Sequence, residues 1–144
     1  MIIKRKGSAT WDGGLKDGKG TISTASGALK AYPYGFAARF EGTPGTNPEE
    51  LLGAAHSGCF TMALSLILGE AKLVADHMET TAEVSLEQQD GGFSITAVKL
   101  TLSAKIPGVD DAKFQELAAA AKANCPVSKL FKGADITLDA KLVS

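Results

Sequence analysis

The sequence predicts a single α+β domain, in which antiparallel strands accompany one long apolar helix. Three observations support this class. Short strand-like segments separated by glycine-rich turns occupy the first forty residues. A long segment that is apolar on nearly every face follows. Alternating strands then flank a second helical segment. We expect residues 1–144 to form one domain, since this length suits a single substantial core.

The N-terminal part is predicted to form a small antiparallel sheet. Strand-like segments occur at residues 2–4, 20–26 and 36–40, with glycine- or proline-containing turns between them. In the last segment, alternation would place Arg39 on the face opposite Phe36 and Phe40. An arginine in that position is most simply a solvated side chain.

The central helix is predicted to begin at Pro48. Asn47 is a good N-cap, proline suits the first helical position, and two glutamates follow at the positive end of the helix dipole. Residues 51–68 are then apolar or small on nearly every face, which predicts a helix buried all round. This long buried helix carries Cys59.

The C-terminal half predicts a hairpin, a second helix and a last strand. The hairpin strands lie at residues 81–87 and 98–106, around a turn at residues 90–92. Asp110 or Asp111 caps the second helix, which ends before Pro126 because a residue preceding proline is disfavoured in the helical region. After a short turn at residues 127–131, the last strand turns one face inward: Ile136, Leu138, Ala140 and Leu142.

Composition and charge argue against several classes of function. The 15 basic and 16 acidic residues leave a net charge of -1 without a basic block, so neither nucleic acid nor an anionic membrane surface is an expected partner. The N-terminus lacks the apolar run of a secretory signal. The apolar run at residues 60–68 is interrupted by Thr61 and Ser65 and is too short to span a bilayer. The expected location is the cytoplasm, where a cysteine pair is either inert or a redox couple.

The two cysteines have different predicted settings. Cys59, in the middle of the apolar helix, is most simply a small core residue. Cys125 lies at a helix end, where the following turn would favour a thiolate. His56 shares the helix face of Cys59, which makes a Cys–His nucleophile pair conceivable. With Cys125 the two could also bind zinc, although a closed structural site needs a fourth ligand. The residues alone leave these alternatives open.

Several motifs together resemble those of the osmotically inducible protein C family. The similarity extends from Gly18 to the closing strand and so covers nearly the whole chain. Because Arg39 lies just ahead of the central helix, the chain is more similar to the osmotically inducible branch than to the organic hydroperoxide resistance branch. The motifs are Pro33-Tyr34-Gly35-Phe36, Arg39-Phe40-Glu41-Gly42, Gly45-Thr46-Asn47-Pro48-Glu49-Glu50-Leu51, Gly53-Ala54-Ala55-His56, Cys59-Phe60 and Cys125-Pro126-Val127-Ser128.

The resemblance implies a stress-defence peroxidase that reduces organic hydroperoxides. It implies an intertwined homodimer, with each active site at the interface of two chains. Cys59 would attack the peroxide and Cys125 would resolve the product as a disulfide, with Arg39 and Glu49 as partners. The implied reaction needs no metal, haem or flavin cofactor. It needs a dithiol reductant, for which a lipoyl-type dithiol is a candidate.

The residue types suit this chemistry. Burial raises the pKa of a thiol, and a guanidinium such as that of Arg39 would favour the thiolate. Glu49 could hold Arg39 through a bidentate pair. Glu49 precedes Cys59 by ten residues, about 15 Å along the helix at about 1.5 Å per residue. Direct contact would therefore need Arg39 as a bridge, or another copy of the chain. Apolar neighbours would suit an organic peroxide: Phe36, Phe40, Leu52, Phe60 and Met62.

Two other functions remain open from the sequence. A hydrolase or acyltransferase would use a Cys59–His56 pair, and it predicts that Cys125 is dispensable. A non-enzymatic stress protein that binds apolar ligands would hold two inert thiols. It predicts that neither cysteine reacts faster than a free model thiol.

Overall fold

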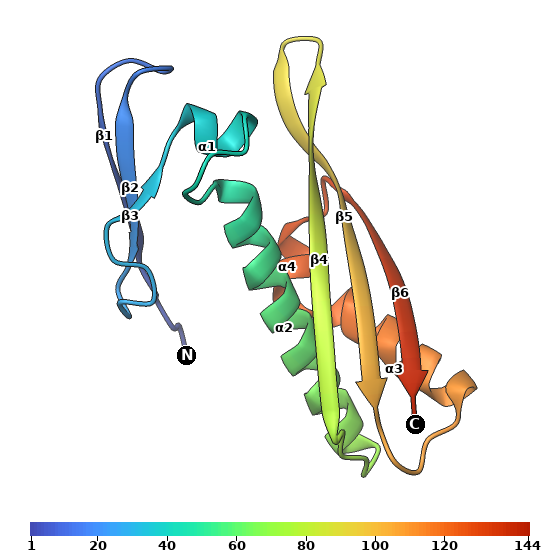
Figure 1. Cartoon of the computed structure of the whole chain (residues 1–144). Helices are drawn as coiled ribbons and strands as arrows, with labels where there is room; N and C mark the ends of the chain where they lie inside the picture. Colours follow the sequence, from blue (N-terminus) through green and yellow to red (C-terminus); the bar gives the residue numbers. More distant parts are fainter. The chain divides into compact units, whose positions relative to one another are not determined.

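The computed structural model describes all 144 residues, which divide into two compact units, Met1–Leu51 and Leu52–Ser144. Each unit contains a three-stranded sheet, and helices accompany both (Figure 1). The chain is therefore α+β, as predicted. The division into two units does not test whether residues 1–144 act as one domain, which stays a prediction.

The sheet of the first unit is antiparallel and has its strands in sequence order: β1 (Gly7–Asp12), β2 (Lys19–Thr24) and β3 (Tyr32–Tyr34). At Gly20 the backbone is closely covered, because an added Cβ would lie 2.5 Å from the ring of Tyr34 and 2.6 Å from that of Trp11. The two rings meet edge to face, with centroids 5.4 Å apart. The absent side chain of Gly20 thus lets two aromatic rings pack over the middle strand.

Two predictions for the first unit are wrong. Residues 2–4 are exposed and lie outside the sheet, because β2 pairs with β1 instead. Phe36–Phe40 forms a short helix, α1, rather than a strand. The rings of Phe36 and Phe40 are therefore 4.9 Å apart, an i,i+4 contact that a helix makes and strand alternation does not. The guanidinium of Arg39 accordingly lies 5.4 Å from the ring of Phe40 rather than across a strand from it.

The long helix α2 (Pro48–Glu70) begins as predicted. The side chain of Asn47 accepts a hydrogen bond of 2.8 Å from the backbone N–H of Glu50, which caps the helix. The prediction of a helix buried on all faces is wrong for the single chain. One face alone is buried, while Met62 is 76% exposed and Leu66 is 66% exposed. The buried positions recur every three or four residues: Gly53, His56, Phe60, Leu64 and Leu68.

The apolar part of α2 is also longer than the sequence analysis allowed. An 18-residue window of this 23-residue helix has a mean hydropathy of 1.7, which by length and composition alone is enough to cross a membrane. The helix continues through Thr61, whose hydroxyl is satisfied within the helix by donating to the carbonyl of Ser57 at 2.7 Å. Core helices of soluble proteins pass the same test, so this property by itself is weak evidence for a membrane span.

The second unit contains the predicted hairpin and final strand. The strands β4 (His77–Gln89) and β5 (Gly92–Lys105) pair antiparallel, and β6 (Asp135–Val143) pairs parallel to β5. A parallel pair needs a crossover connection, which two helices supply: α3 (Asp111–Asn124) and α4 (Pro126–Leu130).

The start and the end of α3 were both predicted correctly. Asp110 caps the helix by accepting a 2.8 Å hydrogen bond from the backbone N–H of Lys113. The helix ends at Asn124, and Cys125 takes an extended conformation (φ -55°, ψ 126°) ahead of Pro126.

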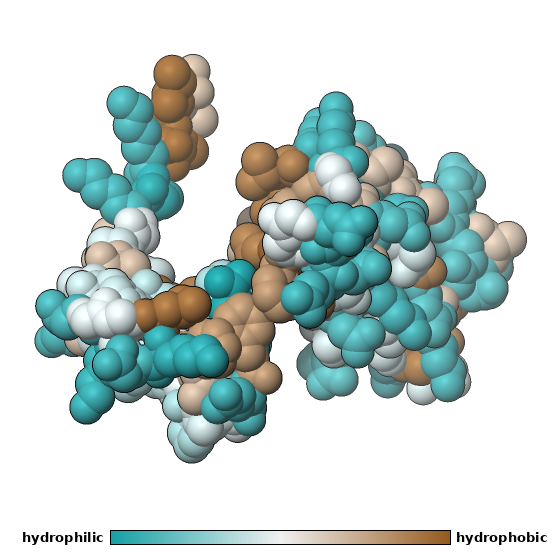
Figure 2. Space-filling view, turned by 90° about the horizontal axis from the view of Figure 1, so that it is seen from above, coloured by the Kyte–Doolittle hydropathy of each residue, from teal (hydrophilic) through white to brown (hydrophobic).

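The core of the second unit lies between its sheet and the helices α2 and α3 (Figure 1). Alternate residues of β5 meet the buried faces of α2 and α3 there. Polar and hydrophobic residues share the outer surfaces of both units (Figure 2). The fully buried members of the core are Phe60, Leu64, Leu100, Phe114, Ala118, Ala121 and Cys125.

We expect Leu64→Ala to lower the free energy of unfolding by about 2–5 kcal/mol, because it leaves a cavity in this core. The same truncation at Leu130, which is 78% exposed, should change it by less than about 0.5 kcal/mol. Urea titration of the reduced protein, followed by circular dichroism, measures both. Equal effects of the two substitutions would contradict the assignment of the core.

Candidate active site

The two cysteines lie next to each other in the second unit, although 66 residues separate them in the sequence. The thiol of Cys125 donates to Cys59, with the two Sγ atoms 2.7 Å apart and both cysteines free. Cys59 comes from the middle of α2 and is partly exposed, whereas Cys125 is fully buried at the junction of α3 and α4. The helix break before Pro126 is what brings the second thiol against the first.

The surroundings of Cys59 act on its pKa in opposite directions. Burial is the main influence and raises the pKa, and the neighbouring Cys125 thiol raises it further. A hydrogen bond from the backbone N–H of Val127, in α4, lowers it. The net effect is a raised pKa, which disfavours the nucleophilic thiolate. A cationic group near the sulfur would act against this effect.

Cys59 opens into a groove of about 700 Å³ along α2. The lining is mostly apolar, and it suits the organic part of a small molecule. Of the apolar residues that the sequence placed around the site, Met62 lines this groove, whereas Phe60 is buried in the core and Phe36 and Phe40 belong to the first unit. The groove is lined by Cys59, Met62, Ala63, Leu66, Ile67, Glu70, Asn124 and Pro126.

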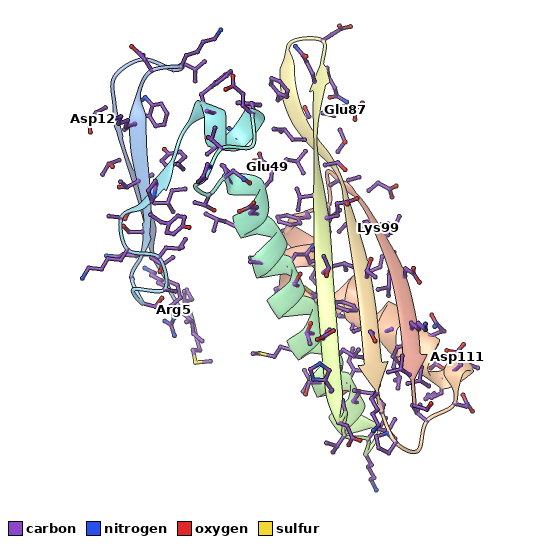
Figure 3. The ribbon with its side chains drawn as sticks, viewed as in Figure 1. Arg5, Asp12, Glu49, Glu87, Lys99 and Asp111 are labelled. Carbon is purple, nitrogen blue, oxygen red and sulfur yellow. The ribbon has the colours of Figure 1, made fainter.

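Within the first unit, Arg39 and Glu49 form the predicted bidentate ion pair. Nη2 of Arg39 donates to Oε1 of Glu49 at 2.7 Å, and its Nε lies 3.2 and 3.3 Å from the two carboxylate oxygens. Arg39 comes from α1. Glu49 lies in the first turn of α2, where Figure 3 labels it. Because a carboxylate holds the planar guanidinium on one edge, its other N–H groups keep a fixed direction.

The arginine also lines a small hollow of about 200 Å³ in the first unit, together with Trp11, Tyr34 and Phe36. The hollow thus combines aromatic side chains with a cation, and the guanidinium of Arg39 lies 5.4 Å from the centre of the Phe40 ring. Arg39 reaches this hollow from the short helix α1, which the sequence did not predict.

His56 does not form the Cys–His pair that the hydrolase alternative requires. Its Nε2 is hydrogen-bonded to Oγ of Ser128 at 2.7 Å, and its Nδ1 is buried without a hydrogen-bond partner. Neither ring nitrogen therefore bonds to Cys59. The zinc alternative is unsupported too, because no three histidine, cysteine or acidic side chains gather as a ligand set. Ser128 was not singled out from the sequence, since nothing links it to a histidine 72 residues earlier.

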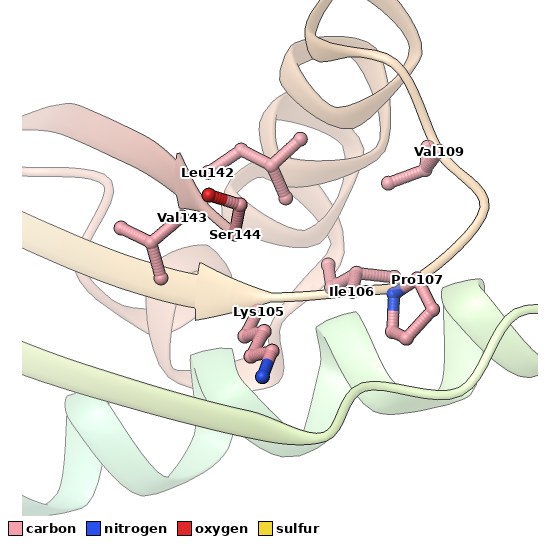
Figure 4. A pocket seen from close by; sticks show the side chains of 7 residues that line it. All are labelled: Lys105, Ile106, Pro107, Val109, Leu142, Val143 and Ser144. Atoms are coloured by element: carbon pink, nitrogen blue, oxygen red, sulfur yellow. The ribbon is translucent and has the colours of Figure 1, made fainter.

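A further hollow, of about 380 Å³, lies where β5 and β6 end and the chain turns toward α3 (Figure 4). Its walls include Lys105, Ile106, Pro107 and Leu142. It contains neither cysteine, neither member of the Arg39–Glu49 pair, and no histidine, so it offers no group for the predicted chemistry.

Comparison with known proteins supports the resemblance noted in the sequence. A family model described as OsmC-like protein matches residues 40–140. Peroxiredoxin OsmC of Escherichia coli (strain K12) is 54% identical over 144 residues, 100% of both chains. The organic hydroperoxide resistance protein OhrB of Bacillus subtilis (strain 168) is 39% identical over 107 residues, 72% of this chain and 76% of the relative.

Solved structures agree with the fold. The crystal structure of OhrB of Bacillus subtilis superposes with a TM-score of 0.71 at 34% identity, covering 94% of this chain and 98% of that one. An organic hydroperoxide resistance protein from Elizabethkingia anophelis gives a TM-score of 0.73 at 29% identity, covering 99% and 100%. The sequence match and the shared fold together show that the chain belongs to the family of OsmC-like proteins.

Proposed function

We propose that this protein is a thiol peroxidase that reduces organic hydroperoxides to alcohols, with Cys59 as the attacking residue and Cys125 as the resolving residue. Membership in the family makes the chain a peroxidase-type enzyme of stress defence. The observation that carries the finer assignment is the contact between the two free thiols, 2.7 Å apart beside an apolar groove. We also place the enzyme in the cytoplasm, where thiols are kept reduced.

In the first step, the Cys59 thiolate attacks one oxygen of the hydroperoxide. The O–O bond breaks, a sulfur–oxygen bond forms, and the organic oxygen leaves as an alcohol after taking up a proton. Cys59 is then a sulfenic acid. The groove supports this step, because its apolar walls accept an organic group while the sulfur lies at its edge.

In the second step, the thiol of Cys125 attacks the sulfenic acid of Cys59. The sulfur–sulfur bond forms, and the hydroxyl group leaves as water with the proton of the Cys125 thiol. The short distance between the sulfurs supports this step, since little movement separates them from bond formation. The disulfide also protects Cys59 from a second equivalent of peroxide.

Arg39 supplies the cation that the raised pKa of Cys59 calls for. A guanidinium near the sulfur favours the thiolate and can hydrogen-bond the peroxide oxygens as charge develops on them. Glu49 holds Arg39 on one edge and leaves its remaining N–H groups for this purpose. In a shared site, the Arg39–Glu49 pair of one chain serves a Cys59 thiolate at the interface.

An external dithiol returns the enzyme to its reduced state. Its first thiolate attacks the Cys59–Cys125 disulfide, and its second thiol releases the resulting mixed disulfide by cyclising. A lipoyl-type dithiol suits this role, because its apolar chain matches the apolar groove from which the disulfide is reached. The electrons for peroxide reduction come from this dithiol, so the route requires no bound cofactor.

The enzyme is a homodimer in which a second copy covers the open face of α2. Met62 and Leu66 expose large apolar side chains beside Cys59, although the rest of α2 has the composition of a core helix. Water contact at such a face is unfavourable, and an identical helix is an apolar partner that is always available. Partial cover of this face would also shield the groove beside Cys59 from water and leave an entrance for the peroxide.

The two alternative functions have less support. A hydrolase needs a base at the nucleophile, and His56 is directed to Ser128 instead. An apolar-ligand carrier would use the same groove, yet it gives no reason for a second thiol in contact with the first.

One equivalent of cumene hydroperoxide should lower the intact mass of the reduced chain by about 2 Da as the disulfide forms. Cys59→Ser should show no change, and Cys125→Ser should gain about 16 Da, the mass of one oxygen. Mass spectrometry after quenching with acid measures all three. An unchanged mass of the wild-type chain after minutes of exposure would rule out the proposed peroxidase.

We expect Arg39→Ala to slow sulfenic acid formation at Cys59 by about 10²–10³-fold, because it removes the cation that stabilises the thiolate and the leaving oxygen. Arg39→Lys should recover little of the rate, since an ammonium group cannot form the bidentate pair with Glu49. Stopped-flow consumption of peroxide in the Cys125→Ser background gives the rates. Lys16→Ala removes another cation near an aromatic ring of the first unit and should leave the rate unchanged. An equal loss in both variants would show a general effect of charge.

We expect Leu66→Glu to convert the dimer into a monomer, because it places a carboxylate in the covered face of α2. Sedimentation equilibrium should give twice the chain mass of 14.9 kDa for the wild type and the single mass for the variant. Leu130→Glu, a matched change at an exposed leucine of α4, should remain dimeric. A wild-type protein that sediments as a monomer at all concentrations would disprove the shared site.

A further inference from the structure

We propose that His56 is a positioning residue for disulfide formation. Through its hydrogen bond to Ser128 it holds α4 where Cys125 reaches Cys59, and it thereby sets how the oxidised Cys59 divides between the disulfide and overoxidation. The inference rests on the proposed function, since it concerns the second step of that reaction. His56 would act through α4 and would not touch the peroxide.

The His56–Ser128 pair lies inside the second unit and outside the groove. His56 is 0% exposed, Ser128 is 6% exposed, and neither lines the groove beside Cys59. The imidazole also packs edge to face on the ring of Phe131, with centroids 5.2 Å apart. The pair therefore joins α2 to the segment that contains α4, and a substrate in the groove would not reach it.

The hydrogen bond between His56 and Ser128, which we call the tether, lies close to the thiol pair along both chain segments. His56 precedes Cys59 by three residues on α2, and residues three apart in a helix share a face. Their partners are close in the chain too, because Ser128 lies in α4 and Cys125 is the residue just before that helix. A change in the position of Ser128 would thus be passed directly to Cys125.

The segment α4 depends on such a tether because it has little else to hold it. A helix of five residues is not stable by itself. Its Pro126, Lys129 and Leu130 are exposed, which leaves Val127 and Ser128 as the residues directed inward. Ser128 provides the hydrogen bond between a side chain of α4 and a side chain of α2.

The position of α4 matters to Cys59 in two ways. The segment follows directly after Cys125, whose thiol contacts Cys59, and it carries Val127, whose backbone N–H lowers the pKa of Cys59. The first influence acts on disulfide formation, because the distance between the sulfurs governs the attack on the sulfenic acid. The second acts on peroxide attack, and it is opposed by the larger effect of burial.

An apolar residue would fill the site of His56 at a lower cost. Nδ1 is buried with no hydrogen-bond partner, and such an orphaned polar atom is unfavourable in a core. Burial also lowers the pKa of His56, which keeps the ring neutral. The benefit that offsets this cost is directional: a hydrogen bond fixes the position of Ser128, which packing of an apolar side chain would not do.

The chemistry that this position controls is a competition. The sulfenic acid of Cys59 either condenses with the Cys125 thiol, which releases water, or reacts with a second hydroperoxide. In the second case one oxygen passes to sulfur, the O–O bond breaks, an alcohol leaves, and Cys59 becomes a sulfinic acid. Condensation takes place within one chain, whereas overoxidation rises with the peroxide concentration. Weakening the tether should therefore lower the peroxide concentration at which overoxidation overtakes the disulfide.

The test compares the two steps in variants of the tether. Ser128→Ala removes one oxygen atom, and His56→Leu replaces the ring by an apolar side chain. We expect disulfide formation to slow about tenfold in each, the loss that a hydrogen bond of ordinary strength would explain. The peroxide concentration that gives half sulfinic acid should fall by the same factor. Sulfenic acid formation, measured with Cys125→Ser added, should slow less than about threefold, since the Val127 contribution is the smaller one.

Two further variants separate positioning from general packing. His56→Gln keeps an amide near the place of Nε2 and should restore part of the rate of disulfide formation. The double variant His56→Leu/Ser128→Ala should be no slower than either single variant, because all of them lose the same bond. Should His56→Leu fail to fold, Ser128→Ala still gives the result, with its melting temperature as the check.

Rapid quenching with acid, followed by intact mass spectrometry, measures disulfide and sulfinic acid together. Disulfide formation at the wild-type rate in Ser128→Ala, with an unchanged concentration for half overoxidation, would overturn the inference. So would an equal loss in both steps, which indicates a core residue without a positioning role. A wild-type chain that forms no disulfide would instead overturn the proposed function, and this inference with it.

Discussion

The helix break at Cys125 is the constraint on which the site depends. Proline at 126 disfavours the helical conformation for the residue before it, so α3 ends and the chain turns into α4. That turn buries Cys125 against Cys59, and it places the N–H of Val127 and the hydroxyl of Ser128 on the same side. A straight continuation of α3 would carry all three groups away from α2. The local stereochemistry of one dipeptide thus determines a contact between residues 66 positions apart.

The burial that brings the two thiols together also disfavours the thiolate form of Cys59. A thiol in a core resists ionisation, and burial is the largest influence on the pKa of Cys59. Within the second unit, the backbone N–H of Val127 lowers the pKa of Cys59. The Arg39–Glu49 pair belongs to the first unit. In the proposed function, this pair supplies the cation that would favour the Cys59 thiolate.

Local signals in the sequence predicted most of the fold and part of the site. Asn47 and Asp110 cap their helices as expected, because a cap involves only residues three apart. Residues 36–40 form a helix and not the predicted strand, since five residues are too few to distinguish helical from alternating periodicity. The His56–Ser128 bond could not be predicted, because its partners are brought together by the packing of α4 and not by spacing. The sequence predicted a helix buried all round, whereas one face of α2 is buried in the single chain. Composition shows that a face is apolar, but it does not show what covers that face.

The open face of α2 links assembly to substrate choice. In the proposed dimer, a second copy covers the apolar side of α2 that the single chain leaves exposed. Complete coverage would close the groove beside Cys59 and leave a peroxidase without access to peroxide. Partial coverage keeps an apolar channel, and its walls then favour organic hydroperoxides over hydrogen peroxide, which has no apolar group to bury. In the proposed enzyme, one apolar surface would thus serve both dimerisation and the selection of substrate.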